Sequence, residues 1–372
     1  MPGTSTVSRS AGLREGRDEP ALAGRLAHMP AREKLERLLE LVRGRKNALV
    51  LTHDNPDPDS IAAAVALADV LQRHARVEAR VGYGGIIGRA ENLAFVKVLK
   101  LPISPISQVV FDEHDCLAMV DTQPVVRNHA LPPSYRADIV IDHHPLREET
   151  LEVPFADVGG DFGATSTMLV EYLRAARLEP SVELATALFY GIKADTRDLD
   201  RLTTKTDVDC YVWLLPRIDK RLLSQIEHPE LPVRYFRLYH KAIERAKVYA
   251  GQAVVTDLGE VYSPDMVAEV AERMVFLEGV KWSLASASFR SQLYLSVRTN
   301  DRRMNAGRMV REICEDFGGS SGGHGSMAGA RVPLSGTRAQ RDVVKRTIVR
   351  RFLEAFGLQG VRPVSVLSAP EE

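Results

Sequence analysis

The fold of this chain is decided by a stretch that reads NALVLTH over residues 47–53 and DNPDPDS over residues 54–60. A short apolar run that ends in polar residues is typical of a buried parallel strand. The segment from Ser60 to Arg73, dominated by Ala, Val and Leu, predicts a helix. The stretch therefore predicts a strand, a tight polar loop and a helix, which together form the repeating unit of an α/β sheet.

The same alternation of strand and helix continues as far as Ile192. Further strands are expected at Val77–Val81, Cys116–Asp121 and Ala137–Asp142, and helices at Arg32–Val42, Glu91–Leu99, Thr165–Ala176 and Ser181–Ile192. Strands that alternate with helices form a parallel sheet, and ligands bind beyond the carboxyl ends of its strands. The predicted fold class is α/β, with an N-terminal parallel-sheet domain flanked by helices.

The character of the sequence changes after Trp213. The charged stretch 220–249 is predicted to be helical and to connect two domains. Beyond it, strands are expected at 253–256, 282–289 and 292–298, and helices at 263–276, 305–317 and 340–356. The expected segments are a disordered leader (1–30), a catalytic metal-binding domain (31–215), a helical connector (216–250), a smaller α/β substrate-binding domain (251–358) and a tail (359–372). We expect the active site in the cleft between the two domains.

The overall charge excludes a general electrostatic attraction to nucleic acid or membranes, because Lys+Arg and Asp+Glu number 49 each. An anionic substrate must therefore be captured locally, by metal ions or a basic patch. The three cysteines are widely separated, which excludes a zinc-type spacing and a disulfide framework and suits a reducing, cytoplasmic compartment. The sequence contains neither the apolar run of a secretory signal nor the roughly 18 apolar residues of a membrane helix, so we expect no membrane partner.

The polar loop after the first predicted strand carries His53, Asp57 and Asp59. An imidazole and carboxylates on one tight loop can converge on divalent metal ions, and Mn²⁺ accepts both ligand types. Pro56 and Pro58 restrict the loop and help to hold such ligands in place. The structural alternative is a helix N-cap, because an Asp or Ser here caps the next helix whatever the function. Taken alone, this motif leaves both interpretations open.

Three further motifs place polar residues where secondary structure is predicted to end. Asp121 ends one hydrophobic strand, Asp142-His143-His144 ends another, and Asp195 follows a helix. Each of these could be an ordinary cap or turn by itself. Together with the first loop, however, they would gather carboxylates that repel one another, and bound cations would relieve that repulsion. The joint pattern therefore predicts a site for two metal ions.

In this order along the chain, the motifs resemble the DHH superfamily of phosphoesterases, and the resemblance covers nearly the whole chain after the leader. The resemblance implies that Asp142 orients a neighbouring metal ligand and that His144 contacts a phosphoryl oxygen. It also implies one metal ion held by His53, Asp57 and Asp121, and a second held by Asp59, Asp121, His143 and Asp195.

The resemblance also implies the chemistry of the site. Two metal ions lower the pKa of a water between them, and the resulting hydroxide attacks phosphorus while both oxygens of the displacement are clamped. The expected cofactors are two divalent ions, with Mn²⁺ favoured and Mg²⁺ or Co²⁺ as alternatives.

The expected second domain contains a glycine-rich stretch, GGSSGGHGSMAGA, over residues 318–330. This stretch resembles the signature of the DHH-associated substrate domain, although its two serines and its methionine depart from the usual pattern. Backbone amides at Gly322 and Gly323 could cradle an anion in a loop, with His324 as a substrate contact. Arg298, at the end of a predicted strand, resembles the arginine that pairs with substrate phosphate. A flexible glycine linker is the structural alternative.

A second glycine-rich stretch, residues 82–92, follows a predicted strand but lacks the Gly-x-Gly-x-x-Gly spacing of a dinucleotide site. We expect a loop at the rim of the metal site, with Arg89 and Asn92 as substrate contacts. An ordinary glycine turn remains an alternative.

The leading hypothesis is hydrolysis of small nucleotide phosphoesters. The chain resembles nano-RNases that also dephosphorylate 3′-phosphoadenosine 5′-phosphate, cyclic-dinucleotide phosphodiesterases, and more distantly the RecJ group. Alternatives left open are a single-strand exonuclease, a polyphosphate or pyrophosphate hydrolase, and a nucleotide-binding sensor without catalysis. The expected partner is a small nucleotide or short oligonucleotide, and a homodimer is left open.

Overall fold

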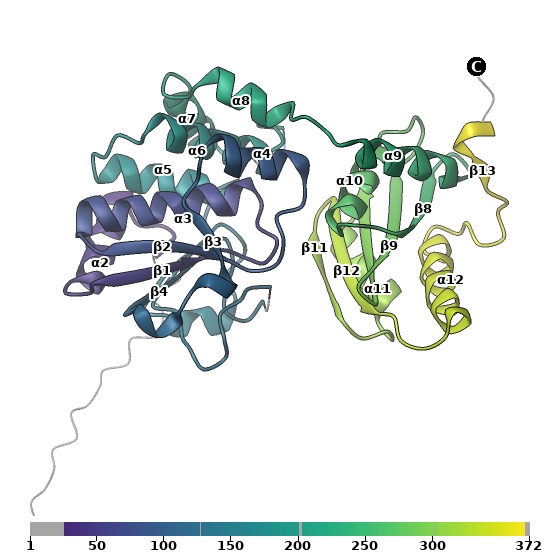
Figure 1. Ribbon diagram of the computed structural model, residues 1–372, viewed down its shortest axis with the longest axis horizontal. Helices are drawn as coiled ribbons and strands as arrows, with labels where there is room; N and C mark the ends of the chain where they lie inside the picture. The colour runs from purple at the N-terminus through teal and green to yellow at the C-terminus, as the bar shows by residue number, and fades with distance from the viewer. Residues whose placement is uncertain (1–25, 127, 201–202, 302, 369–372) are drawn as a thin grey trace, which may run out of the picture. The chain divides into compact units, whose positions relative to one another are not determined.

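The computed structural model describes residues 26–126, 128–200, 203–301 and 303–368 (Figure 1). Much of the predicted leader and the end of the predicted tail lie outside these ranges. The chain forms two compact units. The first extends to Ile86 and resumes from Leu99 to Leu223, and the second comprises Ile87–Val98 and the chain from Ser224 onward.

A six-stranded parallel sheet forms the centre of the first unit. Its strands are β1 (Asn47–Leu51), β2 (Glu78–Tyr83), β3 (Ile103–Pro105), β4 (Cys116–Val120), β5 (Ile139–Asp142) and β6 (Phe155–Val158). They lie in the order β3-β2-β1-β4-β5-β6, and every neighbouring pair is parallel. The predicted α/β class is confirmed. Because the chain order reverses between β1 and β4, this sheet has a topological switch point at that pair, where open α/β sheets bind ligands.

The helices of the first unit are α2 (Ala31–Val42), α3 (Pro58–Val70), α5 (Thr165–Ala175), α6 (Val182–Asp195) and α7 (Lys205–Leu214). Helix α8 (Lys220–Glu227) begins in the first unit and ends in the second. Nearly every residue of α3 is buried, because α3 packs against the sheet and against both α5 and α6. A glycine on α6 permits this close packing. A Cβ at Gly191 would lie 2.4 Å from Ser166 Oγ and 3.2 Å from Asp59 Cα.

The second unit is built on a seven-stranded mixed sheet. Its strands are β7 (Lys247–Tyr249), β8 (Ala253–Glu260), β9 (Trp282–Phe289), β10 (Gln292–Thr299), β11 (Ser320–His324), β12 (Met327–Pro333) and β13 (Val364–Ser365), in the order β11-β12-β10-β9-β8-β7-β13. Its helices contribute to two separate apolar cores: α9 (Val233–Arg245) and α10 (Asp265–Met274) to one, α11 (Ala306–Cys314) and α12 (Arg338–Glu354) to the other. The short helix α4 (Ala90–Val98) also belongs to this unit.

Two features of the second unit differ from expectation. The predicted continuous helix over 220–249 is divided into α8, α9 and strand β7, because Pro229 and Pro232 interrupt the helical pattern. The glycine-rich stretch is a β-hairpin rather than a loop, since Ser320–His324 pairs with Met327–Arg331 across a tight turn. Gly325, with φ +48°, allows that turn. Within the described ranges, no helix has both the length and the apolar character needed to span a membrane.

A buried ion pair fastens α2 to the sheet of the first unit. Lys34 Nζ on α2 lies 2.8 Å from Asp157 Oδ1 on β6, and the two side chains are only 4% and 0% exposed. The hydroxyl of Tyr172 on α5 donates to the other carboxylate oxygen at 2.8 Å. Burial raises the pKa of Asp157, although both partners favour the ionised carboxylate. Lys34 and Tyr172 therefore compensate the buried charge of Asp157.

We predict that Lys34→Met lowers the free energy of unfolding by about 3–5 kcal/mol at neutral pH, because it leaves Asp157 buried without a counter-charge. A carboxyl whose folded pKa is raised destabilises the fold when it is ionised. The loss of free energy of unfolding should therefore be largest above the pKa of Asp157 in the folded protein, and it should shrink as the pH falls through that pKa. Denaturant unfolding of wild type and variant over a pH series measures both effects.

Arg32→Ala is the matched control on the same helix. The Arg32–Glu36 pair has side chains that are 81% and 60% exposed, so its loss should cost at most about 0.5 kcal/mol. Equal losses for the two variants would contradict a stabilising role for the buried pair.

Candidate metal centre

Several of the predicted site residues of the first unit lie at the carboxyl ends of the central strands, whereas Asp59 lies on α3 and Asp195 is the last residue of α6. His53 follows β1, Asp121 follows β4 directly, and Asp142 is the last residue of β5, followed at once by His143. The register pairs Leu51 with Met119 and Val120 with Ile141, so these strands end at similar heights. The side chains therefore gather at the switch point of the sheet.

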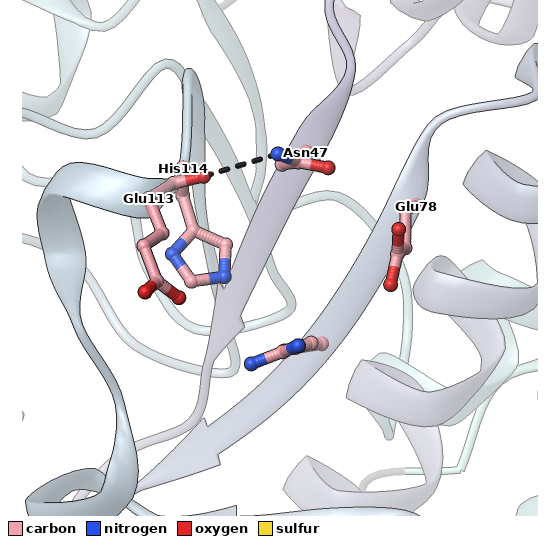
Figure 2. Close-up of a pocket in the computed structure, with 5 residues that line it drawn as sticks. Asn47, Glu78, Glu113 and His114 are labelled. Carbon is pink, nitrogen blue, oxygen red and sulfur yellow. Dashed lines mark hydrogen bonds between the residues drawn. The ribbon is translucent and has the colours of Figure 1, made fainter.

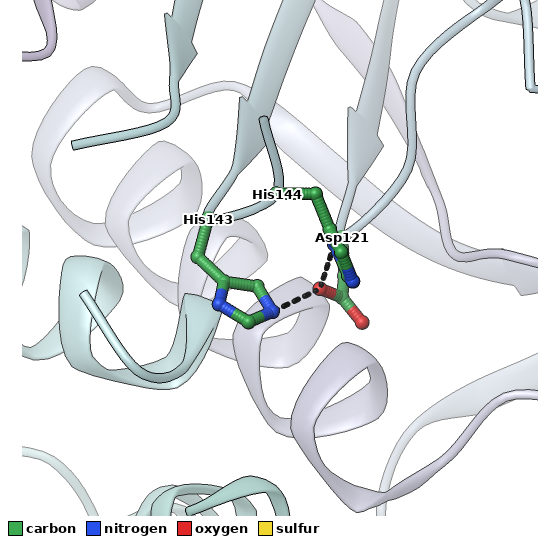
Figure 3. Close-up of side chains that lie close together, drawn as sticks. All are labelled: Asp121, His143 and His144. Carbon is green, nitrogen blue, oxygen red and sulfur yellow. Dashed lines mark ion pairs between the residues drawn. The ribbon is translucent and has the colours of Figure 1, made fainter. Parts of the chain in front are cut away.

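Asp121 belongs to two of the three groups that could hold a metal ion, and so does His143. The Oδ2 atom of Asp121 lies 3.5 Å from His53 Nε2. Its Oδ1 atom lies 3.6 Å from both His143 Nε2 and His144 Nδ1 (Figure 3). The ligand atoms within each group lie within 4.8 Å of one another, and the groups are His53–Asp57–Asp121, Asp121–His143–His144 and Asp59–His143–Asp195. The carboxylate of Asp121 thus presents Oδ2 to His53 and Oδ1 to His143 and His144.

The imidazoles of His53 and His143 are oriented as metal ligands. Nδ1 of His53 lies 3.0 Å from the carbonyl oxygen of Asp54, and Nδ1 of His143 lies 3.3 Å from that of Phe162. Because a carbonyl only accepts, each Nδ1 carries the proton, and in the neutral ring Nε2 keeps its lone pair. Both Nε2 atoms face carboxylates, which is the arrangement of a histidine that binds a metal.

The acidic residues are close enough to shift one another's pKa values. Burial, followed by the charges of Asp121 and Asp195, raises the pKa of Asp59 well above its usual value. Burial alone would also raise the pKa of Asp57, but its hydrogen bond to His53 outweighs this and lowers it. For His53, burial would lower the pKa, but Asp121 and Asp57 raise it. Divalent ions would supply the positive charge that the protonated groups otherwise provide.

The amino end of α5 supports two of the carboxylates. Asp59 accepts hydrogen bonds from the backbone N–H groups of Thr165 and Ser166, both at 2.8 Å. The hydroxyl of Thr165 donates to Asp121 Oδ1 at 2.8 Å. Both carboxylates thus lie at the positive end of a helix dipole. The sequence carries no signal for this role of Thr165, because a threonine is an ordinary residue at the start of a helix.

Asp121 also has an unusual backbone. Its φ is +59°, in the left-handed region that non-glycine residues rarely adopt, and its N–H donates to the carbonyl of Ile141 at 2.9 Å. Residues held in such conformations tend to cluster at functional sites, where the surrounding structure maintains them.

His144 is held by Asp142. Its Nδ1 lies 2.8 Å from Asp142 Oδ1, and its backbone N–H donates to the same oxygen at 3.1 Å. Burial alone would lower the pKa of His144, but the hydrogen bond to Asp142 and the charge of Asp121 outweigh it and raise the pKa to about 10. Nδ1 of His144 is thus engaged by Asp142. The roles expected for Asp142 and His144 stay predictions.

The residues predicted to bind substrate all belong to the second unit. Arg89 Nη2 lies 3.3 Å from Glu272 Oε2, and Asn92 follows on α4. Arg298 is buried at the end of β10, where its Nη1 donates to Ser296 Oγ at 2.8 Å. The backbone positions Gly322, Gly323 and His324 lie on β11, an edge strand of the sheet. The positions of these six residues within the second unit do not test whether they bind substrate. Their predicted role therefore stays a prediction.

A small polar pocket lies at the opposite end of the first sheet. It has a volume of about 100 Å³ and is lined by Asn47, Glu78, Arg80, Glu113 and His114 (Figure 2). Asn47 and Glu78 begin β1 and β2, so the pocket lies at the amino ends of the strands. Glu113 therefore offers a control position remote from the metal ligands.

Comparisons with known proteins agree with this architecture. The DHH family, N-terminal domain, matches residues 47–192, and the DHHA1 domain matches residues 250–350. An uncharacterized protein of Methanocaldococcus jannaschii is 33% identical over 329 residues, which cover 86% of this chain and 67% of that protein. The cyclic-di-AMP phosphodiesterase GdpP of Geobacillus thermodenitrificans is 28% identical over 263 residues, 65% of this chain but only 39% of that enzyme.

Among solved structures, an exopolyphosphatase-related protein from Bacteroides fragilis has a similar fold. It superposes with a TM-score of 0.66 at 15% identity, over 87% of this chain and 98% of that one. At this identity the likeness concerns the fold alone.

The matches to the DHH and DHHA1 families, together with the histidines and carboxylates at the switch point of the sheet, identify the chain as a metal-dependent phosphoesterase. The chain belongs to the DHH family and is a hydrolase.

We predict that Asp121→Ala weakens Mn²⁺ binding by at least about 10- to 100-fold, because it removes an oxygen from two ligand groups at once. Isothermal titration calorimetry with Mn²⁺ measures the loss. Glu113→Gln, at the far end of the sheet, is the control and should bind Mn²⁺ like the wild type. Unchanged affinity in Asp121→Ala would refute the central position given to this residue.

Proposed function

We propose that this chain hydrolyses small nucleotide phosphoesters at a centre of two divalent metal ions. The substrates we envisage are short oligoribonucleotides such as pApA, 3′-phosphoadenosine 5′-phosphate, and cyclic dinucleotides. The observation that carries the proposal is Asp121, whose two oxygens face different groups of potential ligands. Similarity to a cyclic-di-AMP phosphodiesterase over 65% of the chain supports the substrate class.

The donor set fits two ions with mixed nitrogen and oxygen ligands. One ion would be held by His53, Asp57 and Asp121, and the other by Asp59, Asp121, His143 and Asp195. Such ions supply Lewis-acid activation of the nucleophile and of the phosphoryl group. Imidazole together with carboxylate favours Mn²⁺, with Mg²⁺ or Co²⁺ as alternatives. The Nδ1 hydrogen bonds of His53 and His143 support this assignment, because they direct Nε2 toward the carboxylates.

His144 is the proposed contact to the phosphoryl oxygens. We propose that the ring acts as an imidazolium, with one proton on Nδ1 facing Asp142 and the other on Nε2. A fixed N–H donor directed at a phosphoryl oxygen stabilises the negative charge that grows there during displacement. Asp142 keeps the ring in this orientation and does not itself need to touch the substrate.

The second unit is the proposed substrate domain. Arg298, Gly322, Gly323 and His324 would bind a terminal phosphate or base, and Arg89 and Asn92 would add contacts. The matching DHHA1 domain supports this role for the unit as a whole. A cytoplasmic location remains our expectation, since Cys116, Cys210 and Cys314 are buried free thiols that suit a reducing compartment.

The proposal is tested by assaying the full chain with Mn²⁺ against pApA, cyclic di-AMP and 3′-phosphoadenosine 5′-phosphate. We expect turnover of at least one of them, abolished by EDTA and restored by Mn²⁺. Long single-stranded RNA, pyrophosphate and polyphosphate serve as comparison substrates. Turnover confined to these would favour the exonuclease or polyphosphate alternative. Tight nucleotide binding without turnover would identify a sensor.

We further predict that His144→Ala lowers kcat by about 10²- to 10³-fold, because it removes a donor to the developing charge. Mn²⁺ affinity should stay close to that of the wild type, since the proposed ligand sets do not include His144. Steady-state kinetics and calorimetry measure these two quantities. A loss of Mn²⁺ binding equal to that of Asp121→Ala would instead make His144 a metal ligand.

A further inference from the structure

Gln123 lies two residues beyond Asp121 in the loop after β4, and it is only 1% exposed. Both the nitrogen and the oxygen of its side-chain amide form hydrogen bonds. Nε2 donates to Asp142 Oδ2 at 2.8 Å and to the carbonyl oxygen of Pro145 at 3.1 Å. Oε1 accepts from the N–H of Arg147 at 2.8 Å and from the hydroxyl of Thr150 at 3.0 Å. All of these partners come from the end of β5 and the segment that follows it.

We propose that Gln123 is a positioning residue, which fixes the carboxylate of Asp142 and, through it, the imidazole of His144. The inference rests on the function proposed above, in which His144 contacts the phosphoryl group. None of the hydrogen bonds described above joins Gln123 to a proposed metal ligand.

The partners of Gln123 determine the orientation of its amide. Arg147 N–H can only donate, and it faces Oε1. If the amide were flipped, its NH₂ group would meet this N–H, and its oxygen would meet the carboxylate of Asp142. Only one orientation satisfies the partners, so an N–H group necessarily points at Asp142 Oδ2.

This contact completes the hydrogen bonding around Asp142. Oδ2 is engaged by Gln123, whereas Oδ1 accepts from the backbone N–H of His144 and faces its Nδ1. With both oxygens fixed, the carboxylate cannot rotate about its terminal bond without losing a buried hydrogen bond. The imidazole that it holds is therefore fixed as well. A buried glutamine serving only to join two loops would not need to engage this carboxylate.

A double-mutant cycle tests whether Gln123 acts through His144. Gln123→Met keeps the length of the side chain and removes its hydrogen bonds, and we expect it to lower kcat by about 10- to 100-fold. KM and Mn²⁺ affinity should stay within about threefold, because the ligands are untouched. In the His144→Ala background the same substitution should change kcat by less than about twofold. Equal losses in both backgrounds would make Gln123 a purely structural residue and overturn the proposal.

Thr150→Val is the matched control. It removes one hydrogen bond from the oxygen side of the amide and leaves the N–H group on Asp142, so kcat should fall by less than about threefold. A fall as large as that of Gln123→Met would attribute the effect to the loop rather than to Asp142. If Gln123→Met does not fold, Gln123→Asn replaces it, because the shorter amide cannot reach both sets of partners.

A readout without catalysis separates this inference from the proposed function. In the metal-free protein, ¹⁵N–¹H NMR of the histidine side chains should detect a hydrogen-bonded Nδ1 proton on His144. That signal should be lost in Gln123→Met and kept in Thr150→Val. An unchanged signal in Gln123→Met would overturn the positioning role even if the enzyme is active. Loss of the signal in a protein that hydrolyses no phosphoester would uphold it while the proposed function fails.

Discussion

The structure of the site depends on one carboxylate that is shared between two sides. Asp121 can present an oxygen to each side only because β1 and β4 are neighbours, and their adjacency follows from the reversal of strand order at that pair. His53 then approaches from one side and His143 from the other. The left-handed backbone at Asp121 and the hydroxyl of Thr165 hold the carboxylate between them. The proposed chemistry thus requires β1 and β4 to be neighbours in the sheet.

Holding these acids together works against the stability of the fold. Burial and mutual repulsion raise the pKa of Asp59, so in the absence of a cation the acids disfavour one another's ionisation. The amino end of α5 offsets part of this cost through the amides of Thr165 and Ser166. Elsewhere in the same unit, the buried charge of Asp157 has a full counter-charge in Lys34. This difference supports the proposed metal centre, in which bound cations would supply the positive charge that these acids lack.

The site residues that could be predicted from the sequence are those that directly follow a recognisable strand. His53, Asp121 and Asp142 each follow an apolar run, so their common location could be inferred from strand ends alone. Thr165 and Gln123 carried no such signal, because their partners lie far away in sequence and only the fold brings them together. The glycine-rich hairpin was missed for a related reason. Glycine has low strand propensity, and the pairing of β11 with β12 decides its conformation.

The connection between the units bears on how the proposed function can be studied. The segment 87–98, which carries Arg89 and Asn92, leaves the first unit after β2, belongs to the second, and returns before β3. With the later passage at Leu223, the chain crosses between the units three times. Removing the second unit would therefore cut the first sheet's own connection between β2 and β3. The two units are not separable modules despite matching two distinct domain families, and the proposed division of labour between them belongs to the whole chain.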